Sequence, residues 1–231
     1  SADLLTPVAA YLRLSKDEKQ SFLLESVTGG ENISRYSYIA AGDFRTFKAN
    51  DKDGDPLITL EKELNLVKYA KLPGINYFTG GAVGYISYDC VRFFEPHTAR
   101  VEIQDTLKLP NAVLMFVDNL VVFDHLRHCI IIVSHFRVTE NIKNKKDIEI
   151  EYERVKSTIN SIRKTLEMDH TPLPDQKPIE LGPEAVSNVG KDGYEGFVKN
   201  LKKYIKAGDV IQTVPSQRFT KKTNLHPFNA Y

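Results

Sequence analysis

Glu25 and Ser26 follow the apolar residues Phe22-Leu23-Leu24, and Arg35 and Ser37 stand a short distance further on. A glutamate carboxylate can pair with an ammonium group, a serine hydroxyl can donate and accept hydrogen bonds, and an arginine can face a carboxylate. The alternative is that these are polar groups at a strand end that satisfy one another. The residue types alone favour this alternative.

A second polar position lies near the other end of the chain. Gln212 lies between the apolar residues Val210-Ile211 and Val214 in the predicted strand 210–219, just past a predicted helix. A buried amide must be hydrogen-bonded, so Gln212 either joins neighbouring strands or contacts a ligand, and the sequence alone favours the first role. Arg218 is suited equally to clamping an anion and to an internal salt bridge.

Other patterns do not support a nucleotide, metal or nucleophilic site. Gly80-Gly81-x-x-Gly84 lacks the lysine and hydroxyl residue of a phosphate-binding loop, so we interpret its glycines as allowing close packing in a sheet. His125 and His128 fall in a predicted turn without Cys or Glu partners, which favours surface histidines. Residue order alone shows no nucleophile–base arrangement. Cys90 and Cys129 are isolated and are interpreted as reduced thiols.

The composition is that of an ordinary globular protein, with 231 residues, 42% hydrophobic and 26% charged. The formal net charge of +1 gives no reason to expect nucleic acid or a membrane surface as a partner. No apolar run approaches the ~18 residues that a membrane-spanning helix needs, and no signal-peptide pattern is visible. The chain begins at Ser1 rather than Met, which is consistent with loss of an upstream segment, and the cytoplasm is the default compartment.

The apolar periodicity predicts strands and a few long helices without regular alternation. The expected strands are residues 8–14, 21–27, 44–49, 80–89, 112–123 with an interruption at Asp118-Asn119, 129–137 and 210–219, with a hairpin turn at 50–56. The expected helices are residues 59–69, 145–167 and 194–205, the last capped by Asp192 and ended by Gly208. We therefore expect an α+β fold of mostly antiparallel sheets packed with a few helices.

Several motifs occur in one order along nearly the whole chain. They are Leu23-Leu24-Glu25-Ser26, Arg35-Tyr36-Ser37, Gly80-Gly81-Ala82-Val83-Gly84-Tyr85, Tyr88-Asp89-Cys90-Val91-Arg92 and segment 205–219. In these motifs the sequence resembles the N-terminal portion of anthranilate synthase component I, the large subunit that uses chorismate. Segment 89–96 is most similar to fungal members.

The resemblance implies a lyase of tryptophan biosynthesis that converts chorismate and ammonia to anthranilate and pyruvate. It also implies Mg²⁺ as cofactor and a glutamine amidotransferase subunit (component II) as the source of ammonia. Tryptophan would inhibit at an allosteric site, where Ser26 contacts the ligand, Leu24 and Glu25 are its neighbours, and Arg35 and Ser37 are further candidates. An amino-acid ligand is bound by a carboxylate, a hydroxyl and a cation around an apolar pocket. The resemblance therefore favours a ligand-binding role for Ser26 over a purely structural one.

The resemblance also gives Gln212 a place in the chorismate pocket. Related enzymes that add water have a lysine at this position, where it acts as base. A neutral amide cannot take a proton from water, which indicates ammonia as the nucleophile and argues against isochorismate synthase.

The prolines and glycines of residues 169–191 predict a linker, and the resemblance implies a regulatory region at 1–168 and the start of the chorismate-binding domain at 192–231. The family's Mg²⁺ ligands, most of its chorismate contacts and one segment of its tryptophan site would follow Tyr231. We therefore expect no catalytic or metal-binding residue in this chain, and no activity from it alone. Two alternatives stay open: component I of aminodeoxychorismate synthase in the folate branch, and a non-catalytic amino-acid-sensing or scaffold fragment.

Overall fold

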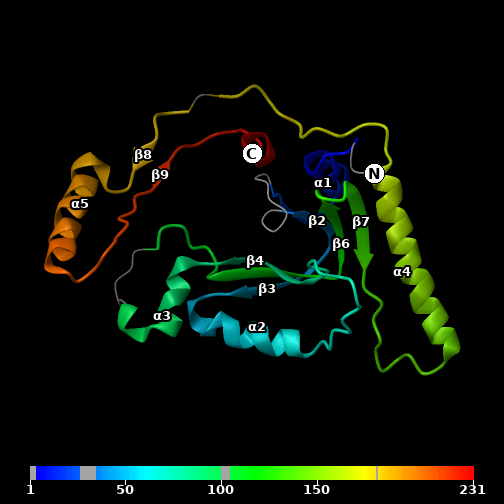
Figure 1. Ribbon diagram of the computed structural model, residues 1–231. Coiled ribbons are helices and arrows are strands. Elements are labelled where there is room, and N and C mark those ends of the chain that lie inside the picture. The colour runs from blue at the N-terminus through cyan, green and yellow to red at the C-terminus, as the bar shows by residue number, and fades with distance from the viewer. Residues whose placement is uncertain (1–3, 27–34, 100–104, 181) are drawn as a thin grey trace. The chain divides into compact units, whose positions relative to one another are not determined.

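The computed structural model describes residues 4–26, 35–99, 105–180 and 182–231 (Figure 1). The chain divides into two compact units, Ser1–Pro172 and Leu173–Tyr231, and the division lies inside the excursion 169–191. In order, the first unit contains α1 (Pro7–Ser15), β1 (Gln20–Leu24), β2 (Tyr36–Gly42), β3 (Arg45–Ala49), α2 (Pro56–Asn65), β4 (Gly81–Ile86), α3 (Val91–Phe94), β5 (Ala112–Val117), β6 (Asn119–Asp124), β7 (Cys129–Ser134) and α4 (Lys145–Leu166).

One sheet of the first unit has the strand order β1-β2-β6-β7, and every neighbouring pair is antiparallel. Residues directly opposite each other share a face, so Ser37 and Phe123 lie on one face and Tyr36 and Asp124 on the other. Helices α1 and α4 pack on the Ser37 face. The helix-side core there consists of Ala10, Ile39, Val121, Phe123 and Leu166.

The other face of this sheet carries a second core, the sheet-side core, which includes residues of a second antiparallel sheet with the order β3-β5-β4. Its buried members are Ala40, Val117, Leu120 and Val122, with Val83 and Met115 of the second sheet packed against them. Asp118 joins β5 to β6, so the chain passes from one sheet to the other at the interruption predicted at Asp118-Asn119. Figure 1 shows α2 alongside the second sheet, where Arg45 of β3 forms a 2.7 Å ion pair with Glu63.

The glycine-rich strand confirms the interpretation of close packing. A Cβ atom on Gly84 would lie 1.9 Å from the carbonyl oxygen of Val113, on the neighbouring strand β5. A side chain at this position therefore forces β4 away from β5.

Three element predictions are wrong. Residues 8–14 are helical rather than extended, because the Thr6 hydroxyl accepts the Ala9 N–H and Pro7 occupies the first helical turn. The expected hairpin at 50–56 is absent from the described structure, since β3 pairs with β5 instead. In segment 210–219 only its last residue belongs to a strand, the two-residue β9 (Phe219–Thr220).

The long helices agree with their predictions. Helix α4 begins with a capping box, in which the Asn144 side chain accepts the Asp147 N–H and the Asp147 side chain accepts the Asn144 N–H. In the second unit, α5 (Gly190–Ala207) ends at Gly208 in the left-handed conformation, as predicted. Asp192 is not its cap, because α5 starts two residues earlier and the Ser187 hydroxyl accepts the Gly190 N–H.

The second unit also contains β8 (Val186–Ser187), which pairs with β9, and α6 (Pro227–Ala230). The predicted α+β class with antiparallel sheets is confirmed. Within the described ranges, no helix is both long and apolar enough to cross a membrane.

Candidate functional site

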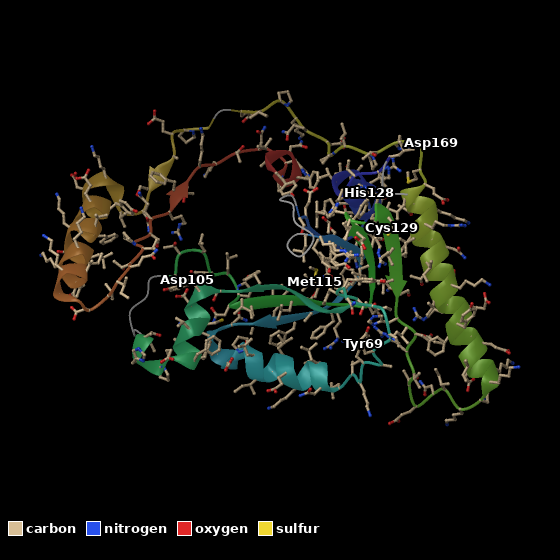
Figure 2. The ribbon with its side chains drawn as sticks, viewed as in Figure 1. Tyr69, Asp105, Met115, His128, Cys129 and Asp169 are labelled. Carbon is tan, nitrogen blue, oxygen red and sulfur yellow. The ribbon has the colours of Figure 1, made fainter. Side chains whose placement is uncertain are left out.

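The candidate site lies at one end of the first sheet. Strand β1 ends at Leu24, β2 begins at Tyr36 and β6 ends at Asp124, and antiparallel pairing brings these three strand ends together. The labelled residues His128 and Cys129 in Figure 2 mark the neighbouring turn and the start of β7. Ser26 and Arg35, which border segment 27–34, both lie at this end of the sheet.

Ser26 is held by Ser37. The backbone N–H of Ser26 donates to the Ser37 hydroxyl oxygen at 3.0 Å, and this oxygen lies 2.7 Å from Nε2 of His125. Ser37 is completely buried, so its hydroxyl supports Ser26 from inside the sheet and does not face solvent. The His125 ring stacks on Phe123, with ring centroids 6.5 Å apart.

Arg35 is held by Asp124 on the opposite face. Its Nε and Nη2 groups donate to the two carboxylate oxygens at 3.0 and 2.6 Å, in the bidentate geometry that arginine favours. The Asp124 carboxylate is 2% exposed and also accepts the backbone N–H groups of Leu126 and Arg127. The hydrogen bond from Arg35 lowers the pKa of Asp124 below its ordinary value, and the same bond raises the pKa of Arg35.

This pair leaves binding capacity on Arg35. The two bonds to Asp124 use two of the five guanidinium N–H groups, and the Arg35 side chain is 24% exposed. The guanidinium carbon also lies 4.9 Å from the centre of the Tyr36 ring, within cation–π range. Arg35 can therefore contact an anionic group while Asp124 fixes its orientation.

Aromatic side chains lie beside Arg35 on the sheet-side face. The Tyr36 ring is 6.2 Å from the Tyr38 ring and 5.6 Å from the Tyr77 ring, distances typical of interacting aromatic pairs. Burial raises the pKa of the Tyr38 and Tyr77 hydroxyls. Leu24 lies opposite Tyr38 in the ladder and is 48% exposed, which adds an accessible apolar group.

Ser37, His125 and Asp124 have the residue types of a hydrolytic triad but not its geometry. The Ser37 hydroxyl is buried, so no substrate reaches it, and the Asp124 carboxylate bonds to Arg35 on the other face of the sheet. A triad requires an accessible nucleophile and a carboxylate that orients the histidine. The arrangement is therefore suited to binding and not to nucleophilic catalysis.

The structure brings most of the predicted residues together. Ser26, Ser37 and Arg35 lie at one sheet end with Leu24 and the half-buried Glu25. Gln212 lies in the second unit, where it is exposed and outside any helix or strand.

Sequence reasoning missed Asp124 and His125. The prediction of surface histidines is wrong for His125, which is half-buried and bonded to Ser37. The available signal was their position directly after the buried strand residues 120–123, where a polar group must find a partner.

A second candidate is an open hollow of about 470 Å³ near the start of α4. Its charged groups are already paired: Arg137 with Asp118, and Arg154 with Glu151 through two 2.7 Å bonds. The hydrogen bonds from Arg154 lower the pKa of Glu151 to about 2. Because these charges neutralise one another, we interpret the hollow as a structural ion-pair network.

The part of the chain that the structure describes shows no metal site. Among the described residues, no group of three or more His, Cys, Asp or Glu side chains is arranged to hold an ion.

Comparison with known proteins decides the class of this chain. Residues 19–231 match the family described as chorismate binding enzyme. The chain belongs to this family. The predicted resemblance to anthranilate synthase component I is confirmed by the relatives described next.

Two fungal proteins are the more similar relatives. The chain is 50% identical over 230 residues to the probable anthranilate synthase component 1 of Schizosaccharomyces pombe, covering 100% of this chain and 46% of that protein. It is 44% identical over 238 residues to anthranilate synthase component 1 of Saccharomyces cerevisiae, covering 98% and 46%. The corresponding protein of Acinetobacter calcoaceticus is 31% identical over 248 residues, covering 100% and 48%. The chain thus spans about half the length of the curated relatives it matches.

A solved structure agrees with this assignment. The crystal structure of anthranilate synthase component I from Streptococcus pneumoniae TIGR4 superposes with a TM-score of 0.62 at 25% identity. The superposition covers 98% of this chain and 49% of that one.

Proposed function

We propose that this chain is the N-terminal half of an anthranilate synthase large subunit. The whole protein would convert chorismate and ammonia to anthranilate and pyruvate. The support is the family match over residues 19–231 together with 50% and 44% identity to two fungal proteins named as component 1. Each of these proteins is about twice as long as this chain, so the activity belongs to the whole subunit.

We also propose that the end of the first sheet is part of a tryptophan feedback site. Ser26, Glu25 and Leu24 would contact the ligand directly, and Arg35 would face its carboxylate. Ser37 would not touch the ligand but would hold the Ser26 backbone through its buried hydroxyl. The observation that carries this proposal is the meeting of a fixed guanidinium, the Ser26 backbone and an aromatic cluster at one sheet end.

Inhibition at such a site works by population shift. Tryptophan would bind better to an inactive arrangement and draw the enzyme towards it, with a coupling of about 1–3 kcal/mol. We propose residues 1–168 as the regulatory region, 169–191 as linker and 192–231 as the start of the chorismate-binding domain.

The remaining assignments concern the rest of the enzyme. We propose that Gln212 lies in the chorismate pocket of the whole protein, where its neutral amide favours ammonia over water as nucleophile. Mg²⁺ would be held by residues in the half of the relatives that this chain does not span. A glutamine amidotransferase would supply the ammonia, and the complex would act in the cytoplasm.

The test is feedback inhibition of the full-length subunit supplied with chorismate, ammonium and Mg²⁺, with anthranilate measured by its fluorescence. Ser26→Leu replaces a small polar side chain of the proposed site with a bulky apolar one, so we expect it to abolish inhibition by tryptophan while anthranilate formation continues. Ser157→Leu, at an exposed position on α4, is the matched control and should stay sensitive. A Ser26→Leu enzyme that loses activity but keeps its sensitivity would refute the site.

A further inference from the structure

Asp124 and His125 contact Arg35 directly and are connected to Ser26 through Ser37. The His125 backbone N–H donates to the Arg35 carbonyl oxygen at 3.0 Å, and the Asp124 carboxylate binds the Arg35 guanidinium. On the other side, the His125 ring reaches Ser26 through the Ser37 hydroxyl. Two adjacent residues at the end of β6 thus fix the positions of Ser26 and Arg35.

The hydrogen bonds at Ser37 favour one position for the ring proton of His125. A serine hydroxyl has one hydrogen and two acceptor positions, and the Ser26 N–H occupies one acceptor position. If His125 Nε2 is unprotonated, the Ser37 hydrogen is donated to it across the 2.7 Å contact. If Nε2 carries a proton, Ser37 accepts twice and its own hydrogen needs another acceptor in a completely buried position. The first arrangement is favoured, and it places the ring proton on Nδ1.

The orientation of the ring is fixed independently. Phe123 and His125 stack with their planes 28° apart, so the imidazole has a supporting surface. A planar side chain at this position keeps its stacking partner even when it cannot accept a hydrogen bond. This separates the packing role of His125 from its hydrogen-bonding role.

We propose that His125 is a positioning residue of the amino-acid site: its unprotonated Nε2 orients the Ser37 hydroxyl, which in turn holds the Ser26 backbone where the ligand carboxylate or ammonium group binds. Asp124 performs the same role for Arg35. This inference rests on the proposed tryptophan site, because Ser26 and Arg35 are assigned to the ligand there. The inference adds His125 and Asp124 to the site as residues that position Ser26 and Arg35 without touching tryptophan themselves.

The first test is a matched pair of variants in the full-length subunit, with tryptophan binding measured by calorimetry. His125→Phe keeps a planar ring against Phe123 but loses the acceptor. His125→Gln offers an amide oxygen near the place of Nε2. We expect His125→Phe to weaken binding by about tenfold, as loss of one buried hydrogen bond predicts, and His125→Gln to stay within about threefold of wild type. Equal affinities for the two variants would overturn the positioning role.

The second test needs no ligand. In ¹⁵N-histidine-labelled protein, the NMR spectrum of the His125 ring should show the Nδ1–H tautomer, and hydrogen exchange at the Ser26 amide should accelerate in His125→Phe but not in His125→Gln. A proton on Nε2, or unchanged exchange in His125→Phe, would overturn the inference. If His125→Phe fails to fold, Ser37→Ala replaces it, and the same loss of Ser26 protection is expected.

The two tests separate the possible failures. If the wild-type protein does not bind tryptophan, the proposed feedback site is wrong, while the tautomer and the Ser26 exchange still decide the positioning role. If wild type binds tryptophan but the two His125 variants bind it equally well, the feedback site is supported and the positioning role of His125 is wrong.

Discussion

At the scale of single residues, polar groups at the end of one sheet combine in two pairs. Ser37 with His125 supports Ser26 on the helix-side face, and Asp124 supports Arg35 on the sheet-side face. Ser26 and Arg35 are thus each held by a buried partner. Residue types alone suggest strand-end polar groups that satisfy one another, and the structure contains this arrangement.

The Asp124–Arg35 pair predicts a pH dependence of stability. Because Arg35 lowers the pKa of Asp124 below its ordinary 3.8, the pair stabilises the fold fully above that value. This stabilisation is lost as the pH falls through the lower pKa of the folded state. Asp124→Asn should therefore reduce the free energy of unfolding by about 2 kcal/mol at neutral pH, with a smaller difference in acid.

Urea unfolding at neutral pH and at about pH 2 measures this difference. Asp43→Asn is the matched control, because Asp43 forms an exposed ion pair with Lys19 and its replacement should change stability by less than about 0.5 kcal/mol. A loss in Asp124→Asn that is equally large in acid would show that the charge of Asp124 is not responsible.

At the scale of elements, the close approach of β4 and β5 depends on a missing side chain. Gly84→Ala places a Cβ 1.9 Å from the Val113 carbonyl oxygen, a contact that only separation of the strands relieves. We expect a loss of more than about 4 kcal/mol in unfolding free energy, or failure to fold.

The same substitution should have the opposite effect in α5. A Cβ on Gly196 meets no atom within 4 Å, and alanine favours a helix over glycine, so Gly196→Ala should stabilise α5 by about 0.5–1 kcal/mol. Thermal denaturation of both variants provides the comparison. A Gly84→Ala protein as stable as wild type would mean that β4 and β5 are not packed as described.

Helix α4 carries a second pH-dependent pair. Glu151 has a pKa of about 2 against an ordinary 4.5, chiefly because Arg154 donates to it, so the pair stabilises the helix above pH 4.5 and loses this effect as the pH falls towards 2. Arg154 is 42% exposed, and solvent screening limits the contribution to about 1 kcal/mol. Melting temperatures of wild type and Glu151→Gln should differ at neutral pH and converge near pH 2; a constant difference would exclude the ionised pair as its cause.

Local signals in the sequence were sufficient to predict the long helices and the break between strands at Asp118-Asn119. They were insufficient wherever a partner far along the chain decides the structure, as for β3, whose neighbour β5 begins at Ala112. The apolar run 8–14 suits a strand by composition, but the Thr6 cap and Pro7 start a helix there. His125 was missed because its partner Ser37 lies 88 positions away in the sequence.

At the scale of the whole molecule, the chain is about half of the proteins it resembles, and its second unit places Gln212 in an exposed, irregular segment. The feedback site at the first sheet and the chorismate pocket near Gln212 are therefore proposals about a longer protein. The first unit brings Ser26, Arg35 and an aromatic cluster to one end of a sheet, and we propose this end as part of an amino-acid site.

The most direct measurement is calorimetric titration of tryptophan into the full-length subunit and into the chain Ser1–Tyr231. We predict saturable binding by the full-length protein and none by the shorter chain, because we propose that part of the site lies in the half of the relatives that this chain does not span. Absence of binding by both proteins would contradict the feedback assignment and favour the folate-branch enzyme or a scaffold.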